Sequence, residues 1–352
     1  MAHTTMRAWR VHEYGEPVAA LRLDEVPVPE PGPGEILVRA LAVPLNLNDY
    51  ERVTGANMAV RVPLPYPPGM ETMGIVEACG PGAEALLGMR VAATTRHAVG
   101  GFAEYVIGSA AAAFEVPESI PMPDAACIFF PFHLAWMGLF DRAGLQAGES
   151  VLIHAAAGGS GSAAIQLAKH RGAKVFATVG SDAKKQLCLD LGADVVINYT
   201  TEDFAAVVLE ATANRGVDVV FDNVGDAVWA ASLKCIAYNG RYLMMGFASD
   251  KRFVDEKFVV PRQLSMANIR LCGVLLSYAP DAAVPAMKSA IGANFAPRSL
   301  GVRIQREIVD LVLAGAVKPV IGRVVDFAEL PAALAAMVNR DTVGRVVGRL
   351  YD

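Results

Sequence analysis

Closely spaced glycines near the middle of the chain form a pattern that could bind a phosphate. The run VLIHAAAGGSGSAAIQLAK, residues 151–169, opens with an apolar strand and closes with a helical repeat of apolar residues. Glycine lets a backbone turn sharply and approach a ligand closely, and the first turn of the next helix offers free amides to an anion. This spacing predicts the strand, turn and helix that hold a dinucleotide pyrophosphate. The predicted turn consists of Gly158, Gly159, Ser160 and Gly161.

The end of the following strand, predicted over 174–179, indicates which dinucleotide is bound. An NAD site usually places Asp or Glu about 20 residues after the glycines, where it accepts hydrogen bonds from the ribose. Here the strand ends in neutral residues up to Ser181, and Lys184 follows in the next helix. This arrangement leaves room for a 2′-phosphate and predicts NADPH. Asp182 argues mildly against it, although an acidic residue in a first helical turn is already explained by the helix dipole.

Two further strand ends carry glycines that suit contact with a ribose or a nicotinamide. Ligands of such sheets lie beyond the carboxyl ends of the strands, where glycine lets the cofactor approach the backbone. The alternative is an ordinary turn between strand and helix. The residues concerned are Asn223 and Gly225 after one strand, and Gly246 and Phe247 after another.

Composition and pattern predict a two-domain α/β protein. The chain has 352 residues, more than one core usually supports. Short strands separated by proline and glycine fill the first part, among them one at 102–107. Strands and helices alternate from about 133 to 274, with strands at 195–198, 217–222 and 241–246, as in a doubly wound parallel sheet. The final part has helices near 302–314 and 330–339 and a strand at 345–350, which we expect to pair with the first β domain.

Charge and cysteine content exclude several classes of protein. A net charge of −5 gives no reason to expect nucleic acid as a partner. No apolar run of about 18 residues predicts a membrane span. Five widely spaced cysteines without a C-x-x-C pair favour reduced thiols, and we expect a cytoplasmic protein.

Seven sequence blocks in order resemble the medium-chain dehydrogenase/reductase superfamily, in its zinc-free quinone oxidoreductase branch, which includes zeta-crystallin. The resemblance runs nearly end to end, and it implies a GroES-like catalytic domain built from both chain ends, a central Rossmann domain and a homodimer. It implies catalytic-domain segments at 1–126 and 286–352 and an NADPH-binding domain at 127–285. The blocks are PGPGEILVRALAVPLNLND (31–49), PYPPGMETMGIVEACGPG (65–82), GGFAEYV (100–106), LQAGESVLIHAAAGGSGSAAIQLAK (145–169), GADVVINY (192–199), GVDVVFDNVG (216–225) and the C-terminal VGRVVGRL.

The same comparison argues against a metal. Alcohol-oxidising relatives have a His-Glu pair at the segment where this chain has Met70 and Glu71, and a cysteine after an early strand. Without a Lewis acid an alkoxide is poorly stabilised, so alcohol oxidation is disfavoured. Quinones and α,β-unsaturated carbonyls fit better, because a hydride added to them gives a delocalised phenolate or enolate.

The resemblance also implies further cofactor contacts. Asn46 and Asp49 match an N-x-x-D motif near the nicotinamide, although a polar turn after a strand would look the same. The segment at 56–59 lacks the tyrosine that enoyl-thioester reductases of the family use as proton donor, and Phe247 replaces a smaller or polar residue beside the nicotinamide. The residues that match the 2′-phosphate grip are Ser181, Lys184, Tyr199 and Arg340.

Three side chains are candidates for the proton donor. They are Tyr50, Tyr66 and His133. His133 titrates in a suitable range, yet a histidine among aromatic residues is more often structural, and either tyrosine is equally well explained as a packed aromatic.

We therefore predict an enzyme that passes hydride from NADPH to a quinone or an α,β-unsaturated carbonyl (EC 1.6.5 or 1.3.1), by alignment and exclusion of water. One alternative is an enoyl-thioester reductase acting on an enoyl-CoA or carrier-protein ester. The other is a non-catalytic, crystallin-like protein that binds NADPH.

Overall fold

The chain divides into two compact units. The computed structural model describes residues 4–56, 62–246, 259–339 and 342–350. The first unit contains residues 1–130, 277–313 and 321–352, and the second contains 131–276 and 314–320. The chain therefore passes from one unit to the other four times.

The first unit is built on a six-stranded, mainly antiparallel sheet in the order β15-β16-β3-β4-β5-β6, with β3 also pairing to β6. A separate pair, β1 and β2, is antiparallel. The C-terminal strand β16 lies antiparallel to β3, with Val347 opposite Pro44, which confirms the pairing predicted for the last strand. The strands are β1 (Thr5–Val11), β2 (Leu21–Pro27), β3 (Glu35–Pro44), β4 (Glu71–Cys79), β5 (Arg90–Thr95), β6 (Tyr105–Glu115), β13 (Tyr278–Ala279), β14 (Ala296–Pro297), β15 (Ile321–Asp326) and β16 (Arg345–Arg349).

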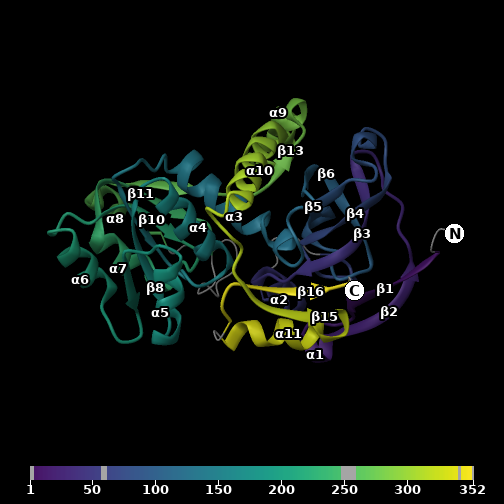
Figure 1. The fold of residues 1–352 in the computed structure, drawn as a ribbon, viewed down its shortest axis with the longest axis horizontal. Helices are drawn as coiled ribbons and strands as arrows, with labels where there is room; N and C mark the ends of the chain where they lie inside the picture. The colour runs from purple at the N-terminus through teal and green to yellow at the C-terminus, as the bar shows by residue number, and fades with distance from the viewer. Residues whose placement is uncertain (1–3, 57–61, 247–258, 340–341, 351–352) are drawn as a thin grey trace. The chain divides into compact units, whose positions relative to one another are not determined.

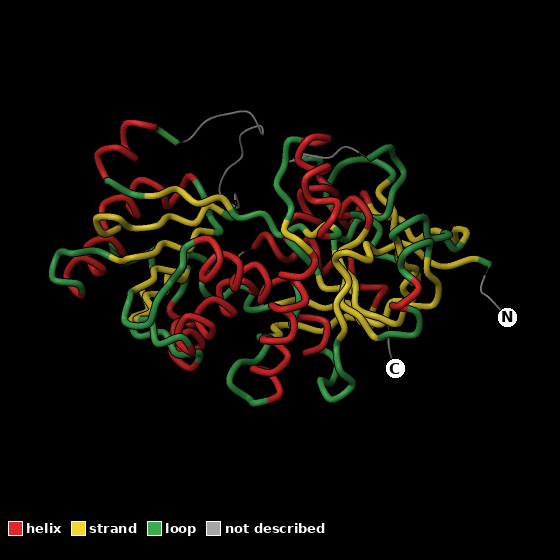
Figure 2. Tube along the Cα trace, turned by 90° about the horizontal axis from the view of Figure 1, so that it is seen from above, coloured by secondary structure: helices red, strands yellow, loops and turns green. Residues whose placement is uncertain are grey.

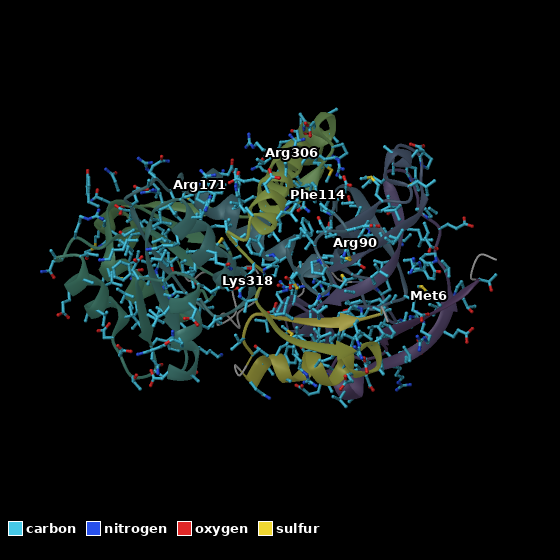
Figure 3. The ribbon with its side chains drawn as sticks, viewed as in Figure 1. Met6, Arg90, Phe114, Arg171, Arg306 and Lys318 are labelled. Carbon is cyan, nitrogen blue, oxygen red and sulfur yellow. The ribbon has the colours of Figure 1, made fainter. Side chains whose placement is uncertain are left out.

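Short helices and polar clamps close this unit. Arg90 donates from one nitrogen to the carbonyls of Val116, Pro117 and Ile120, at 3.3, 2.6 and 3.1 Å. Phe114, labelled with Arg90 in Figure 3, meets Tyr278 edge-on at 5.2 Å between ring centroids. The helices are α1 (Pro17–Ala20), α2 (Leu47–Thr54), α9 (Val284–Ile291), α10 (Arg298–Leu313) and α11 (Leu330–Ala336).

The second unit is a six-stranded sheet in the order β12-β11-β10-β7-β8-β9, in which every neighbouring pair is parallel. Figure 1 labels β8, β10 and β11 among the helices of this unit, and Figure 2 draws strands in yellow and helices in red. The chain runs outward from β7 through β8 to β9 and then returns to β10 on the other side of β7. This reversal is the point at which ligands bind in doubly wound sheets. The strands are β7 (Ser150–Ile153), β8 (Lys174–Val179), β9 (Val195–Asn198), β10 (Val217–Asp222), β11 (Ile236–Met244) and β12 (Arg270–Gly273).

Helices alternate with these strands, as the sequence pattern predicted. They bury a core that contains Leu152, Phe176, Phe221 and Tyr242, all fully buried. Among the described residues, no helix is long and apolar enough to cross a membrane. The helices are α3 (Phe130–Trp136), which begins at the boundary between the units, α4 (Gly159–His170), α5 (Lys185–Asp190), α6 (Phe204–Ala211), α7 (Asp226–Cys235) and α8 (Pro261–Ala267).

Some observed bounds differ from those predicted. The strand predicted at 102–107 is β6, which begins at Tyr105 and extends to Glu115, because a run of alanines gives no alternation to read. The strand predicted at 241–246 begins earlier, at Ile236. The first unit includes 127–130 and 277–285, which the sequence placed in the cofactor domain, and excludes 314–320.

Candidate functional site

The glycine turn lies between β7 and α4, at the reversal of strand order. Gly158 is the N-cap of α4, no side chain caps the helix, and no acidic residue stands in its first turn. A Cβ on Gly161 would lie 2.4 Å from the carbonyl oxygen of Ala155, so only glycine fits there. Uncapped amides with no acidic residue in their own helical turn are suited to a pyrophosphate, and the residues of the turn therefore fit a dinucleotide.

Hydrogen bonds fix this turn to the neighbouring strands. The backbone amide of Ala156 donates to the carbonyl of Thr178 at 3.1 Å, and the backbone amide of His154 donates to the carbonyl of Phe221 at 3.0 Å. The His154 ring, fully buried, bonds through Nδ1 to Thr178 Oγ1 at 3.0 Å and through Nε2 to Ser232 Oγ at 2.8 Å. Burial lowers the pKa of His154 to about 3, so the ring is neutral at ordinary pH. Sequence reasoning did not single out His154, whose only signal was a histidine at the end of an apolar strand.

The predicted 2′-phosphate residues of the second unit gather at the ends of β8 and β9. Ser181 precedes a short 3-10 turn that includes Lys184, whose amide donates to the Ser181 carbonyl at 3.2 Å. A Cβ on Gly180 would lie 2.7 Å from the hydroxyl oxygen of Tyr199. This hydroxyl therefore lies beside Gly180, the residue that precedes Ser181 in the chain. Arg340 falls outside the described residues.

Neighbouring charges at this end of the sheet are paired. Lys185 binds Glu202 at 2.7 Å and Asp182 at 3.2 Å. Hydrogen bonds from the side-chain amide of Asn198 and from Lys185 lower the pKa of Asp182. The carboxylate that argued against NADPH therefore has partners within the protein.

The ends of β10 and β11 approach each other closely. A Cβ on Gly246 would lie 2.3 Å from the carbonyl oxygen of Asn223. Buried Asp222 accepts from the amides of Val224 and Gly225 at 2.7 and 3.0 Å, and from the hydroxyl of Tyr242 at 2.7 Å. Asp222 and Tyr242 thus shape this strand end, although the sequence did not reveal their pairing. Phe247 lies outside the described residues.

Asn46 and Asp49 belong to a buried polar cluster of the first unit. The amide nitrogen of the Asn46 side chain donates to Glu71 at 2.9 Å, and Arg345 donates to its carbonyl oxygen at 2.8 Å and also to Glu71. Arg345 comes from the C-terminal strand, which is why the sequence did not associate it with Asn46.

Asp49 is fully buried within this cluster. Its Oδ2 accepts from the backbone amide of Asn46 at 2.9 Å, whereas Oδ1 lies 3.8 Å from a nitrogen of Arg52 and has no hydrogen-bond partner in the described part of the chain. Burial raises the pKa of Asp49 to about 6, although Arg52 opposes the rise.

The three candidate proton donors lie in different surroundings. Tyr50 donates its hydroxyl proton to Glu16 at 3.0 Å, and its pKa is raised, chiefly by burial. Tyr66 is buried in the core of the first unit, donates to the carbonyl of Arg52 at 3.0 Å, and has a pKa raised by burial to about 12. His133 is fully buried in α3, in the second unit.

Within the described segments, no group of three His, Cys, Asp or Glu side chains is arranged to hold a metal ion. The Asn46 side chain, at one end of the buried cluster, is hydrogen-bonded through its nitrogen to Glu71 and through its oxygen to Arg345. Met70 offers only a thioether sulfur, a poor ligand for zinc.

Comparisons with known proteins agree with this architecture. A family model described as "Alcohol dehydrogenase GroES-like domain" matches residues 32–118, and one described as "Zinc-binding dehydrogenase" matches 159–290. A quinone oxidoreductase of Rattus norvegicus is 33% identical over 68% of this chain and 73% of that protein. A 2-haloacrylate reductase of Burkholderia sp. is 35% identical over 64% of this chain and 69% of that protein. A mycobacterial structure complexed with NADPH has a TM-score of 0.84 and 31% identity, covering 98% of this chain and 99% of that one.

Proposed function

Because the chain belongs to the medium-chain dehydrogenase/reductase superfamily, in its quinone oxidoreductase branch, we propose that it reduces a quinone or an α,β-unsaturated carbonyl with NADPH and without zinc. The observation that carries the proposal is the uncapped N-terminus of α4, which Gly161 brings against the end of β7. When bound, the nicotinamide supplies the hydride. The chain's own residues bind the cofactor, orient it and exclude water.

NADPH is favoured over NADH by the end of β8. Ser181, Lys184 and Tyr199 offer two hydroxyls and a cation there, and Lys185 neutralises Asp182. A 2′-phosphate is best held by such donors, whereas NAD sites present a free carboxylate to the ribose.

An electron-poor acceptor suits the first unit. Asn46 and Glu71 are bonded to each other and to Arg345, so the cluster offers no set of metal ligands, and a conjugated acceptor needs no Lewis acid. The names of the rat and Burkholderia relatives, a quinone oxidoreductase and a 2-haloacrylate reductase, both describe reduction of conjugated acceptors.

Among the three proton-donor candidates, we favour Tyr50. The Tyr66 hydroxyl is committed to a backbone carbonyl in a core, and the His133 ring is fully buried. The Tyr50 hydroxyl is bonded to the exposed side chain of Glu16 and not to a backbone carbonyl in a core. Tyr50→Phe should therefore lower turnover of enones more than turnover of quinones, because a phenolate product needs a proton less urgently than an enolate.

The function is tested by mixing the protein with NADPH and a panel of acceptors and following absorbance of the reduced nicotinamide. Oxidation with quinones or enones is the expected result. Saturable oxidation with an enoyl-CoA alone would favour the thioester reductase, and tight NADPH binding without oxidation by any acceptor would favour the non-catalytic protein. One tightly bound zinc per chain, measured by metal analysis, would refute the metal-free mechanism.

We also propose that the protein forms a homodimer through the edge strand β12. This strand ends the sheet, and it and the adjoining segments expose Met266, Leu271 and Leu275, at 78%, 38% and 53% of their surface. An apolar sheet edge is usually covered. Leu271→Lys should give monomers in sedimentation at protein concentrations where the parent chain is dimeric, and a monomeric parent chain would refute the proposal.

A further inference from the structure

The segment 314–320 belongs to the cofactor-binding unit, although the chain on both sides of it belongs to the other unit. Helix α10 ends at Leu313 and strand β15 begins at Ile321, both in the first unit. Between them, Val317 is 2% exposed and Gly315 has a φ of +70°. The segment is therefore a short connection held at its middle.

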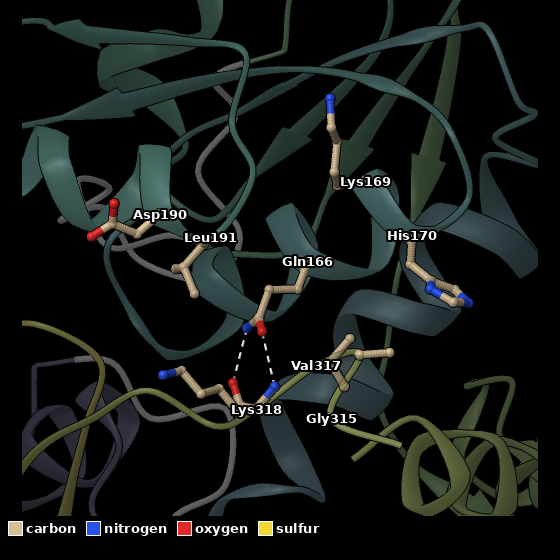
Figure 4. Close-up of a pocket in the computed structure, with 9 residues that line it drawn as sticks. Gln166, Lys169, His170, Asp190, Leu191, Gly315, Val317 and Lys318 are labelled. Atoms are coloured by element: carbon tan, nitrogen blue, oxygen red, sulfur yellow. Dashed lines mark hydrogen bonds between the residues drawn. The ribbon is translucent and has the colours of Figure 1, made fainter. Parts of the chain in front are cut away.

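Gln166, on α4, holds this connection (Figure 4). Its Nε2 donates to the carbonyl of Lys318 at 2.9 Å, and the amide of Lys318 donates to its Oε1 at 2.9 Å. The same Nε2 donates to the carbonyl of Ser162 at 3.1 Å. The side-chain amide thus binds the backbone of Lys318 in the way that a neighbouring strand would.

The orientation of this amide is determined by its partners. Both hydrogens of Nε2 point to carbonyls, and Oε1 receives an amide hydrogen. A reversed amide would direct oxygen at two carbonyl oxygens and nitrogen at an N–H group. Gln166 is only 8% exposed, so water does not readily replace these bonds.

Packing alone holds the segment incompletely. A cavity of about 420 Å³ lies beside it, lined by Gln166, by residues 315–318 and by the ends of α4 and α5. Lys169, on its border, is bound to Asp194 at 2.6 Å, and its side chain points away from Gln166 in Figure 4. Beside this cavity, Gln166 holds the backbone of Lys318 by hydrogen bonds, and the burial of Val317 holds the residue before it.

We propose that Gln166 is a positioning residue that fastens this connection to the helix carrying the pyrophosphate turn. Gly161 and Gln166 are five residues apart on α4, about 7.5 Å along its axis, so one rigid helix fixes both the turn and the connection. Movement of the connection is then confined to its two ends, as in a hinge. The kinetic part of this inference rests on the proposed reduction with NADPH, whereas the anchoring does not.

The test compares Gln166→Met with Gln305→Met. Methionine has nearly the shape of glutamine but neither donates nor accepts in this way. Gln305, 5% exposed, donates to the carbonyl of Glu115 at 2.8 Å within the first unit, so its variant loses a buried bond of the same kind elsewhere. Hydrogen exchange of the peptide containing 314–320, the Kd for NADPH and kcat with a quinone are measured for the parent chain and both variants.

Loss of the two hydrogen bonds between Gln166 and the backbone of Lys318 should speed hydrogen exchange at the Lys318 amide by about tenfold or more, in the Gln166 variant only. Its Kd for NADPH should stay within about twofold, because the turn at 158–161 is untouched, while kcat falls by about fivefold or more. Unchanged exchange would overturn the anchoring. Equal loss of kcat in both variants would reduce Gln166 to a general stabilising role and overturn the positioning. A parent chain without turnover would overturn the proposed function and the positioning together, and exchange would still decide the anchoring.

Discussion

Replacing Asp49 by asparagine should change how the stability of the protein depends on pH. Burial raises the pKa of Asp49 to about 6, from an ordinary value of 3.8. Asparagine keeps the acceptor for the backbone amide of Asn46, now 2.9 Å from Oδ2, but does not ionise. The variant thus removes the charge and leaves the turn.

The magnitude follows from the shift in pKa. A difference of about 2.2 pKa units, at about 1.4 kcal/mol each, corresponds to about 3 kcal/mol. Because the folded-state pKa is raised, the contribution of Asp49 to the free energy of unfolding is greatest below pH 3.8 and is lost as pH rises through about 6. About 2 kcal/mol of this fall lies between pH 4.5 and 8. In Asp49→Asn this fall should be absent, so the variant gains stability relative to the parent chain as pH rises.

Urea unfolding followed by tryptophan fluorescence at several pH values measures the effect. Asp218→Asn is the matched control: although burial opposes it, hydrogen bonds from Arg215 and Ser150 hold the pKa of Asp218 at about 2. Removing a stabilised carboxylate should lower stability by a constant amount above pH 4.5, where both folded and unfolded states are ionised. Parallel curves for Asp49→Asn and the parent chain between pH 4.5 and 8 would refute the reasoning.

Three further predictions concern the cofactor site. Lys184→Ala should weaken the binding of NADPH by about tenfold or more in a fluorescence titration and leave the binding of NADH unchanged. Lys185→Ala, which breaks only ion pairs within the protein, should affect both cofactors alike. Equal losses of affinity for NADPH and NADH in Lys184→Ala would contradict the assignment. Gly161→Ala should abolish detectable NADPH binding by calorimetry, because its Cβ would meet a backbone oxygen, while Gly15→Ala, with nothing within 4 Å, should bind as the parent chain does. Tyr242→Phe should lower the free energy of unfolding by about 1–3 kcal/mol at pH 7, since it removes the hydroxyl that donates to Oδ2 of buried Asp222, and an unchanged urea midpoint would show that this bond is dispensable.

The cofactor-binding unit was largely predictable because its sequence signals are local. The bounds of β8, β9 and β10 match the predicted strands residue for residue, and the turn before α4 follows from the glycines together with the apolar strand before them and the helical repeat after them. The GroES-like unit was predicted chiefly through its resemblance to a family.

The contacts that escaped prediction join residues far apart in the chain. Arg345 meets Asn46 and Glu71 only because β16 returns to β3, and Gln166 meets Lys318 across a long stretch of sequence. Periodicity reports which face of an element is buried, but it does not report which distant partner covers that face.

The pairing of β16 with β3 also sets an order for synthesis and folding. The cofactor-binding sheet is made from one continuous stretch, so it has all its strands once residue 276 has been added. The other sheet waits for residues 345–349, which are made after every strand of the parallel sheet. Until then β3 exposes a strand edge that invites association with other chains. A premature stop after residue 344, which removes β16, should consequently produce aggregates that still contain a folded parallel sheet.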